Sequence, residues 1–220
     1  MKIFKHVVRS MDQNVYFYYD ENTMEGVIVD PGSDGKKIME LVEEKGINVK
    51  AILLTHGHGD HIGGIPEIRK KYQWPIAAHD WEKEVLIDKN MNLSSMIAGK
   101  VEFAPDVILN DGDIFTVGSG SLKVLHTPGH TVGGVCYYSE EDNLVFTGDT
   151  LFYASIGRTD FPNPKLSDGK GYPSKENFDR LVASIKEKLY TLPDETVAYP
   201  GHGGDTKIGF EKKFNPFVKG

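Results

Sequence analysis

Apolar and polar residues alternate over much of the first thirty positions, a pattern typical of short β-strands. Three segments, 2–8, 15–19 and 26–30, are β-branched or aromatic and are separated by polar turn residues. The period then changes, because the apolar residues of segment 34–45 recur at helical spacing and Gly46 follows as a typical C-terminal stop. The pattern therefore predicts a three-stranded meander and then an amphipathic helix.

The rest of the chain continues with apolar runs and helical patterns. Segment 51–54 is short and wholly apolar, as expected of a strand buried on both faces. Further strands are predicted at 76–78, 107–109, 114–117, 122–126, 134–139, 144–147 and 197–199, and helices at 62–72, 80–87 and 175–189. Each half thus has several strands and then helices, which is typical of two packed sheets with helices outside.

One long loop is predicted at 160–173. This segment is rich in Pro, Gly, Asn, Ser and Asp, so it cannot continue a helix or a central strand. Loops of this length are more often functional than accidental.

The composition is that of a soluble globular protein. The 220 residues are 39% hydrophobic and 26% charged, which fits one domain over 1–220 and leaves the oligomeric state open. A net charge of −7 without a local basic patch predicts no nucleic-acid partner. No run approaches the roughly 18 apolar residues of a membrane span, and no signal-peptide pattern begins the chain. We therefore expect no membrane partner and a cytoplasmic location, in which Cys136 is a strand-buried thiol.

The segment 55–61, Thr-His-Gly-His-Gly-Asp-His, packs three histidines and an aspartate into six positions. Imidazole and carboxylate groups are good ligands for zinc and similar metals. On an α-helix, His56 and His58 would point about 200° apart, so the segment must be extended or turning if both bind one ion. Asp60 and His61 would then lie at the start of the next helix. This density of histidines favours a metal site over a plain polar turn.

Three later positions, each just after a predicted strand, are suited to complete such a site. His130 follows Thr-Pro-Gly, Asp149 follows an apolar run and Thr-Gly, and His202 follows Tyr-Pro-Gly. A Pro-Gly turn reverses the chain tightly and can aim the next side chain back from the strand end. A single histidine of this kind is more often a surface residue, but the three positions together with segment 55–61 indicate one convergent site.

In identity and chain order, these residues resemble the metallo-β-lactamase superfamily. The resemblance implies an α/β (α+β) fold, a four-layer αββα sandwich with the site between the edges of its two sheets. It implies seven ligands for two divalent metal ions: His56, His58 and His130 for the first, Asp60, His61 and His202 for the second, and Asp149 between them. We expect zinc, with iron or manganese as alternatives because the same donors suit all three.

Within the superfamily the chain is similar to the glyoxalase II branch, on the residues 148–152, 155–162 and 199–202. This similarity implies a small-molecule substrate and hydrolysis of an acyl thioester, as in hydroxyacylglutathione hydrolases. Two metal ions lower the pKa of a shared water from about 15.7 toward 7, which supplies hydroxide at neutral pH. Asp149, holding both ions, and Asp60, orienting the water, are the catalytic candidates.

Other residues are candidates for supporting roles. Asp30 is a candidate for fixing a histidine tautomer, although it also suits a plain turn after a strand. Arg158 and Tyr153 are candidates for substrate binding, although Arg158 is equally suited to pair with Asp160 and hold the loop. The histidines outside the motifs, at positions 6, 79 and 126, are given no role.

Alternative functions follow from departures from the branch pattern. The chain ends soon after His202, without the helical region through which full-length glyoxalase II binds glutathione, so poor glutathione recognition is expected. A persulfide dioxygenase is the main alternative; it would use one iron held by His56, His130 and Asp149. A lactonase and an RNA-processing nuclease are further alternatives, and the acidic charge argues against the nuclease.

Overall fold

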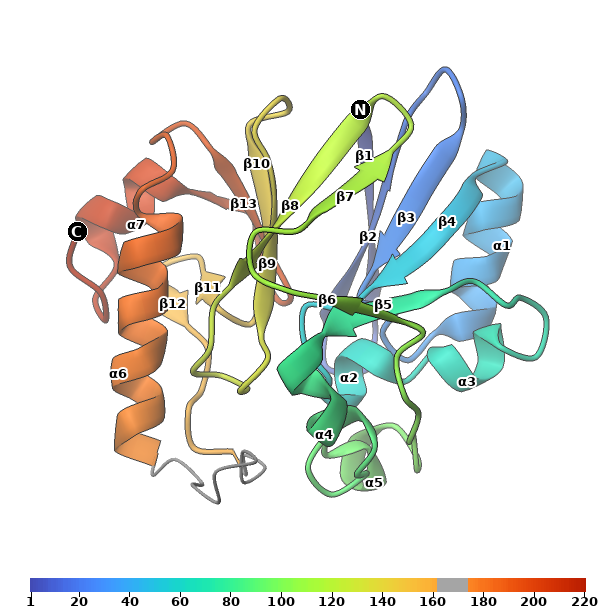
Figure 1. Ribbon diagram of the computed structural model, residues 1–220, viewed down its shortest axis with the longest axis horizontal. Helices are drawn as coiled ribbons and strands as arrows, with labels where there is room; N and C mark the ends of the chain where they lie inside the picture. The colour runs from blue at the N-terminus through green and yellow to red at the C-terminus, as the bar shows by residue number, and fades with distance from the viewer. Residues whose placement is uncertain (162–173) are drawn as a thin grey trace.

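Two six-stranded sheets pack face to face in the computed structural model, which describes residues 1–161 and 174–220 (Figure 1). The first sheet has the order β1-β2-β3-β4-β5-β6. Its strands are β1 Lys2–Val8, β2 Gln13–Tyr19, β3 Glu25–Val29, β4 Asn48–Leu53, β5 Ile76–His79 and β6 Val107–Leu109. The strands β3 to β6 are parallel, so their carboxyl ends meet at one edge.

The second sheet has the order β14-β13-β10-β9-β8-β7. Its strands are β7 Ile114–Val117, β8 Gly120–His126, β9 Val135–Ser139, β10 Leu144–Gly148, β13 Val197–Pro200 and β14 Thr206–Lys207. A two-stranded hairpin, β11 Leu151–Phe152 and β12 Ser155–Ile156, follows β10. Because β9 is antiparallel to both β8 and β10, and β10 is parallel to β13, the strands β8, β10 and β13 all end at the same edge.

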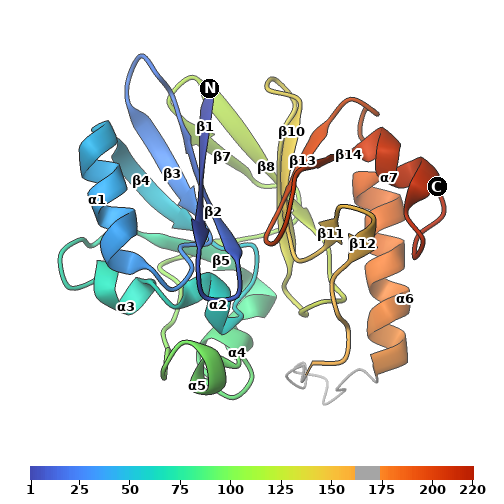
Figure 2. The ribbon, with the colours of Figure 1, turned by 180° about the vertical axis from the view of Figure 1, so that it is seen from behind.

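Helices cover the outer faces of both sheets. Figures 1 and 2 show α1 outside the first sheet, α6 and α7 outside the second, and α2, α4 and α5 at one end of the sandwich. The helices are α1 Gly35–Lys45, α2 Gly59–Ile62, α3 Ile65–Ile68, α4 Lys83–Leu86, α5 Ser94–Ile97, α6 Ser174–Ser184 with a π-helical turn Ile185–Leu189, and α7 Ile208–Phe214. The predicted four-layer sandwich is therefore confirmed.

The central strands of both sheets are buried on both faces. Ile28 packs in the cluster that includes the apolar side of α1, whereas its neighbours Val27 and Val29 pack in the cluster between the sheets. On the second sheet, Leu125 and Cys136 pack in a third cluster against α6. Two buried faces explain the continuous apolar runs in the sequence. Cys136 is a buried thiol as predicted, and burial raises its pKa to about 11.

The structure corrects the helix predicted at 62–72. It is divided into α2 and α3, because Gly63 and Gly64 lie between them. Glycine is a poor helix former, and a side chain at Gly64 would come within 2.8 Å of the Pro31 carbonyl oxygen, so this backbone packs closely against the turn after β3. The helix predicted at 80–87 begins as a 3₁₀ turn, Asp80–Glu82, and continues as α4.

Some expectations are only partly covered by the structure. The helices α5 and α7 and the strands β11, β12 and β14 are short and were not predicted from the sequence. Most of the predicted loop 160–173 lies outside the described residues. No helix in the described part of the chain is long and apolar enough to cross a membrane. The extent of the domain, 1–220, stays a prediction.

A stacked pair of histidines links the two sheets. His79 ends β5 and His126 ends β8, and their rings are 4.1 Å apart and inclined by only 11°. Trp81 packs edge-on against both rings. Burial lowers the pKa of His79 to about 4, and it also lowers the pKa of His126, so both rings are neutral at pH 7.

We expect the free energy of unfolding to fall as the pH is lowered from about 6.5 toward 4. An unfolded histidine binds a proton below about pH 6.5, whereas this folded pair resists protonation, so acid favours the unfolded state. Denaturant unfolding at pH 7 and pH 5 should show a smaller acid-induced loss in His79→Phe, which keeps a ring but cannot titrate. His6→Phe is the control and should lose as much stability as the wild type. Equal losses in all three proteins would contradict the prediction.

Candidate metal centre

Four strand ends deliver the predicted ligands to one edge of the sandwich. Each strand leads into part of the set: β4 into His56 and His58, β8 into His130, β10 into Asp149 and β13 into His202. The helix α2 adds Asp60 and His61. Because all four strands end at this edge, side chains far apart in the sequence converge there. The structure brings all seven predicted ligands together.

The backbone of the histidine-rich loop changes conformation within the motif. It is extended at His58, with φ −64° and ψ 148°, and becomes helical at Gly59. The expected extended conformation therefore applies to His58, but Asp60 lies in the first turn of α2. This change directs Asp60 and His61 to a different ligand group from that of the first two histidines.

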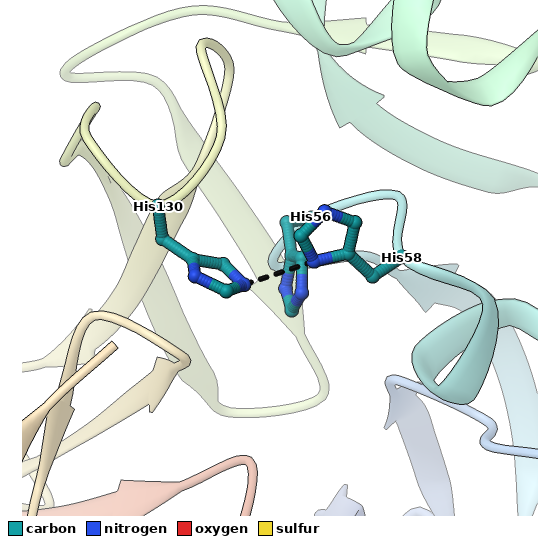
Figure 3. A group of neighbouring side chains, drawn as sticks. All are labelled: His56, His58 and His130. Atoms are coloured by element: carbon teal, nitrogen blue, oxygen red, sulfur yellow. Dashed lines mark hydrogen bonds between the residues drawn. The ribbon is translucent and has the colours of Figure 1, made fainter. Parts of the chain in front are cut away.

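The first ligand group consists of His56, His58 and His130. One ring nitrogen from each lies within 4.8 Å of the others, and Nδ1 of His58 is 2.9 Å from Nε2 of His130. Figure 3 shows His130 approaching from the side opposite His58. All three side chains are buried. Two nitrogens bound to one tetrahedral zinc ion lie about 3.3 Å apart, so this spacing suits a shared ion.

The second ligand group consists of Asp60, His61 and His202, whose ligand atoms also lie within 4.8 Å of one another. The Nε2 atom of His202 is 3.2 Å from Oδ2 of Asp60. Asp149 stands between the two groups: its Oδ1 is 3.3 Å from Nε2 of His61, and its Oδ2 is 3.5 Å from Nε2 of His130. Oδ2 is also 3.7 Å from Nε2 of His202, so Asp149 faces ligand atoms of both groups, as expected of a bridging ligand.

The electrostatics differ between the groups. Burial lowers the pKa of His56 well below its usual value and that of His58 to about 3, so both rings keep free lone pairs at neutral pH. Burial acts in the same direction on His61, but the neighbouring carboxylates, led by that of Asp149, outweigh it and raise its pKa well above the usual value. The second group is therefore rich in negative charge and attracts cations.

The residues present fit bound metal ions. Nε2 of His56, Nε2 of His61 and Oδ1 of Asp149 are buried and have no hydrogen-bond partner among the described residues. An unpaired buried polar group costs about 1–3 kcal/mol, so a cluster of them calls for a bound ion. Imidazole and carboxylate donors suit zinc, iron and manganese.

Asp30 holds the second group in place. Nδ1 of His61 donates to Oδ2 of Asp30 at 2.9 Å, which leaves Nε2 of His61 for a metal ion. Thr55 completes the contact, because its hydroxyl donates to Oδ2 and its backbone N–H donates to Oδ1 of Asp30. The sequence identified Asp30 as a candidate for this role, and the geometry agrees.

Backbone carbonyl groups orient two further histidines. Nδ1 of His130 donates to the carbonyl of Arg158 at 2.7 Å, and Nδ1 of His202 donates to that of Met11 at 3.0 Å. Both rings therefore direct Nε2 toward Asp149. No sequence signal marks these acceptors, because every residue carries a carbonyl group.

Gly201 is required for space. A side chain at this position would overlap Oδ1 of Asp149 and the ring of His61. The glycine of the Pro-Gly-His segment thus lets the backbone pass directly over the candidate bridging carboxylate.

A cleft of about 740 Å³ opens over the centre. The ligands at its base are His58, Asp60, His130, Asp149 and His202. Its walls are mainly apolar and consist of Met11, Leu93, Met96, Ile97, Phe152, Ser155, Ile156, Arg158 and Phe161. A molecule that enters the cleft would therefore meet an apolar surface beside the candidate ligands.

The two candidate substrate-binding residues lie in different surroundings. Arg158 lines the cleft, forms a two-point ion pair with Asp160 at 3.0 and 2.8 Å, and lies over the ring of Phe161. Tyr153 is 58% exposed and stacks on Phe210, with 5.0 Å between the ring centroids. Their roles in substrate binding stay predictions.

Comparisons with known proteins agree with this geometry. The family model of the metallo-beta-lactamase superfamily matches residues 9–202. The chain is 40% identical to the probable metallo-hydrolase YqgX of Bacillus subtilis, over 100% of this chain and 99% of that protein. It is 33% identical to the hydroxyacylglutathione hydrolase GloC of Haemophilus influenzae, over 96% of this chain and 95% of that protein.

Solved structures show the same similarity. The crystal structure of BLEG-1 B3 metallo-beta-lactamase is 34% identical in sequence, covers 100% of both chains and has a TM-score of 0.86. The crystal structure of TTHA1623 in a di-iron-bound form is 31% identical, covers 98% of this chain and 100% of that chain, and has a TM-score of 0.80.

We expect Asp30→Asn to weaken the binding of one of two zinc ions by about 10- to 100-fold, as is typical when a residue that orients a metal ligand is lost. With its amide nitrogen at the Oδ2 position, the asparagine would donate to Nδ1 of His61 and shift the ring proton to Nε2, which could then not bind metal. In the other orientation its NH₂ group would face the backbone N–H of Thr55. Both groups are hydrogen-bond donors, so the contact that now fixes Asp30 would be lost. Zinc titration against a chromophoric chelator measures the affinities.

Asp20→Asn is the matched control, because Asp20 also accepts backbone N–H groups, from Asn22 and Ser119, but lies in a remote turn. It should leave both zinc affinities unchanged. Two unchanged affinities in Asp30→Asn would show that Asp30 does not orient a ligand.

Proposed function

Because this chain belongs to the metallo-β-lactamase superfamily, we propose that it is a cytoplasmic hydrolase that cleaves small acyl thioesters with two divalent metal ions. The observation that carries the proposal is the pair of ligand groups on either side of Asp149, at the base of an apolar cleft. When bound, the ions supply hydroxide at neutral pH and polarise the carbonyl group under attack. A thiolate is a stable leaving group, with a parent pKa of about 8.5, so little acid catalysis is needed.

The residues have distinct roles in this proposal. The first group would hold one ion and the second group the other, and Asp149, which faces both groups, would be available to each. Asp60 orients the attacking water: although burial opposes its charge, His61 and His202 keep the pKa of Asp60 below its usual value, so it remains a hydrogen-bond acceptor. Zinc is the proposed metal, and iron is the main alternative because TTHA1623 has a di-iron form.

The cleft favours an apolar substrate over a glutathione thioester. Glutathione carries two carboxylates, which would need cationic partners. Arg158 is the one Lys or Arg that lines the described part of the cleft, and it is already paired with Asp160. The identity with GloC supports thioester chemistry, while the apolar walls support an acyl group with a hydrocarbon chain.

Two other reactions have some support. A persulfide dioxygenase would use one iron at His56, His130 and Asp149, which do lie together, but it would leave the second ligand group without a function. Oxygen uptake with glutathione persulfide tests this reaction. Because the chain is also similar to BLEG-1 B3 metallo-beta-lactamase, a β-lactam should be assayed as a substrate.

We expect metal-stripped protein refilled with zinc to release thiol from simple acyl thioesters. His61→Ala should lower kcat/KM more than about 100-fold, because it removes a ligand of the second ion. A thiol reagent measures the released thiol. His6→Ala is the control, because His6 lies outside the site, and it should be as active as the wild type. If a broad thioester panel gives no zinc-dependent release, the proposed reaction is wrong.

We expect Met96→Ser to lower kcat/KM for a long-chain acyl thioester by about 10-fold while leaving that for the acetyl thioester nearly unchanged. Met96 lines the cleft yet is 81% exposed, so its truncation should remove apolar contact with substrate without disturbing the core. Ile87→Ser is the control, since Ile87 is an exposed apolar residue outside the cleft. Equal effects on both substrates would argue against an acyl-chain subsite.

A further inference from the structure

Glu82 is a buried carboxylate that joins the two loops carrying the first ligand group. It is 1% exposed and ends the 3₁₀ turn that follows β5. Its Oε1 accepts the N–H of Gly57 at 2.8 Å. Its Oε2 accepts the hydroxyl of Thr131 and the N–H of Gly133, both at 2.9 Å. Three donors from two loops therefore converge on one side chain.

The positions of these donors connect Glu82 to the ligands. Gly57 lies between His56 and His58 in the loop after β4 of the first sheet. Thr131 directly follows His130 in the loop after β8 of the second sheet. A contact that fixes Gly57 relative to Thr131 thus also limits the separation of the histidines on the two loops.

The loop around Gly133 is closely fitted to Glu82. A side chain at Gly133 would overlap the backbone nitrogen of Glu82 and lie 2.7 Å from its Oε2. Other contacts join the loops nearer to the strands, where the N–H of Val135 donates to the carbonyl of Thr55. Glu82 acts farther along both loops, beside the ligands themselves.

Burying a carboxylate at this position has a cost. Burial raises the pKa of Glu82 to about 7, and the three donors partly offset this effect. All three donors belong to the ligand-bearing loops. An apolar side chain would fill the same space without needing three hydrogen-bond donors from these loops.

We propose that Glu82 is a positioning residue that sets the separation of His56 and His58 from His130 and thereby the metal affinity of the first ligand group. The inference rests on the metal ligation in the proposed function, but it does not depend on which substrate is cleaved. Zinc binding therefore tests it separately from any thioester assay.

The experiment compares Glu82→Gln with Glu211→Gln by zinc titration against a chromophoric chelator. A glutamine at 82 has one NH₂ group, which must face the N–H of either Gly57 or Gly133, so one loop loses its acceptor. Glu211 is a matched control because it is also buried and accepts three hydrogen bonds, from Ala154, Thr206 and Asn215. These partners lie outside the two loops.

We expect Glu82→Gln to bind one zinc ion about 10- to 100-fold more weakly, while Glu211→Gln keeps both affinities. Repeating the titration in the His61→Ala background, where the first ligand group alone is intact, should show the same loss. Denaturant unfolding of both variants measures their stabilities. Unchanged zinc affinity in Glu82→Gln, with a stability loss like that of Glu211→Gln, would overturn the proposal.

Thr131→Val provides the test if Glu82→Gln does not fold. It removes one of the three donors at nearly constant volume and leaves the carboxylate in place. We expect a smaller loss of zinc affinity, of about threefold to tenfold, in the His61→Ala background. A folded Thr131→Val protein with unchanged affinity would overturn the proposal.

Discussion

Asp149 lies largely buried between the two ligand groups, with histidine nitrogens of both groups within 3.7 Å of its oxygens, and much of the structure serves to make this arrangement possible. A buried carboxylate is stable only beside compensating charge or hydrogen-bond donors. Here the compensation comes from His61 in the first sheet's loops and His130 and His202 in the second's. The strands that lead to these residues must therefore end at a common edge, as β8, β10 and β13 do in the second sheet and β4 does in the first.

Buried carboxylates recur around this edge in supporting positions. Asp30 accepts from Thr55 and His61, and Glu82 accepts from both loops of the first ligand group. Burying either carboxylate costs free energy of desolvation. Each of them nevertheless fixes a loop at the point where that loop presents a ligand. The apolar clusters hold the sheets together, while these carboxylates position the short segments that the clusters do not reach.

The sequence predicted those parts of the site that depend on local signals. His56, His58 and His130 stood out because closely spaced histidines and Pro-Gly turns are visible in a short window. The role of Glu82 was missed because two of its three partners are backbone N–H groups, which leave no pattern in the residue types. The helix α5 was missed because its four residues, 94–97, are too few to show a period.

The cleft is divided between the sheets in the same way as the ligands. One wall includes Met96 and Ile97 from α5, beside the first sheet, and the other includes Phe152 and Ile156 from the hairpin that follows β10 of the second. None of these four side chains belongs to either ligand group, so the walls can change while the metal centre is kept. We therefore expect the apolar walls, more than the ligands, to decide which acyl group the proposed hydrolase accepts.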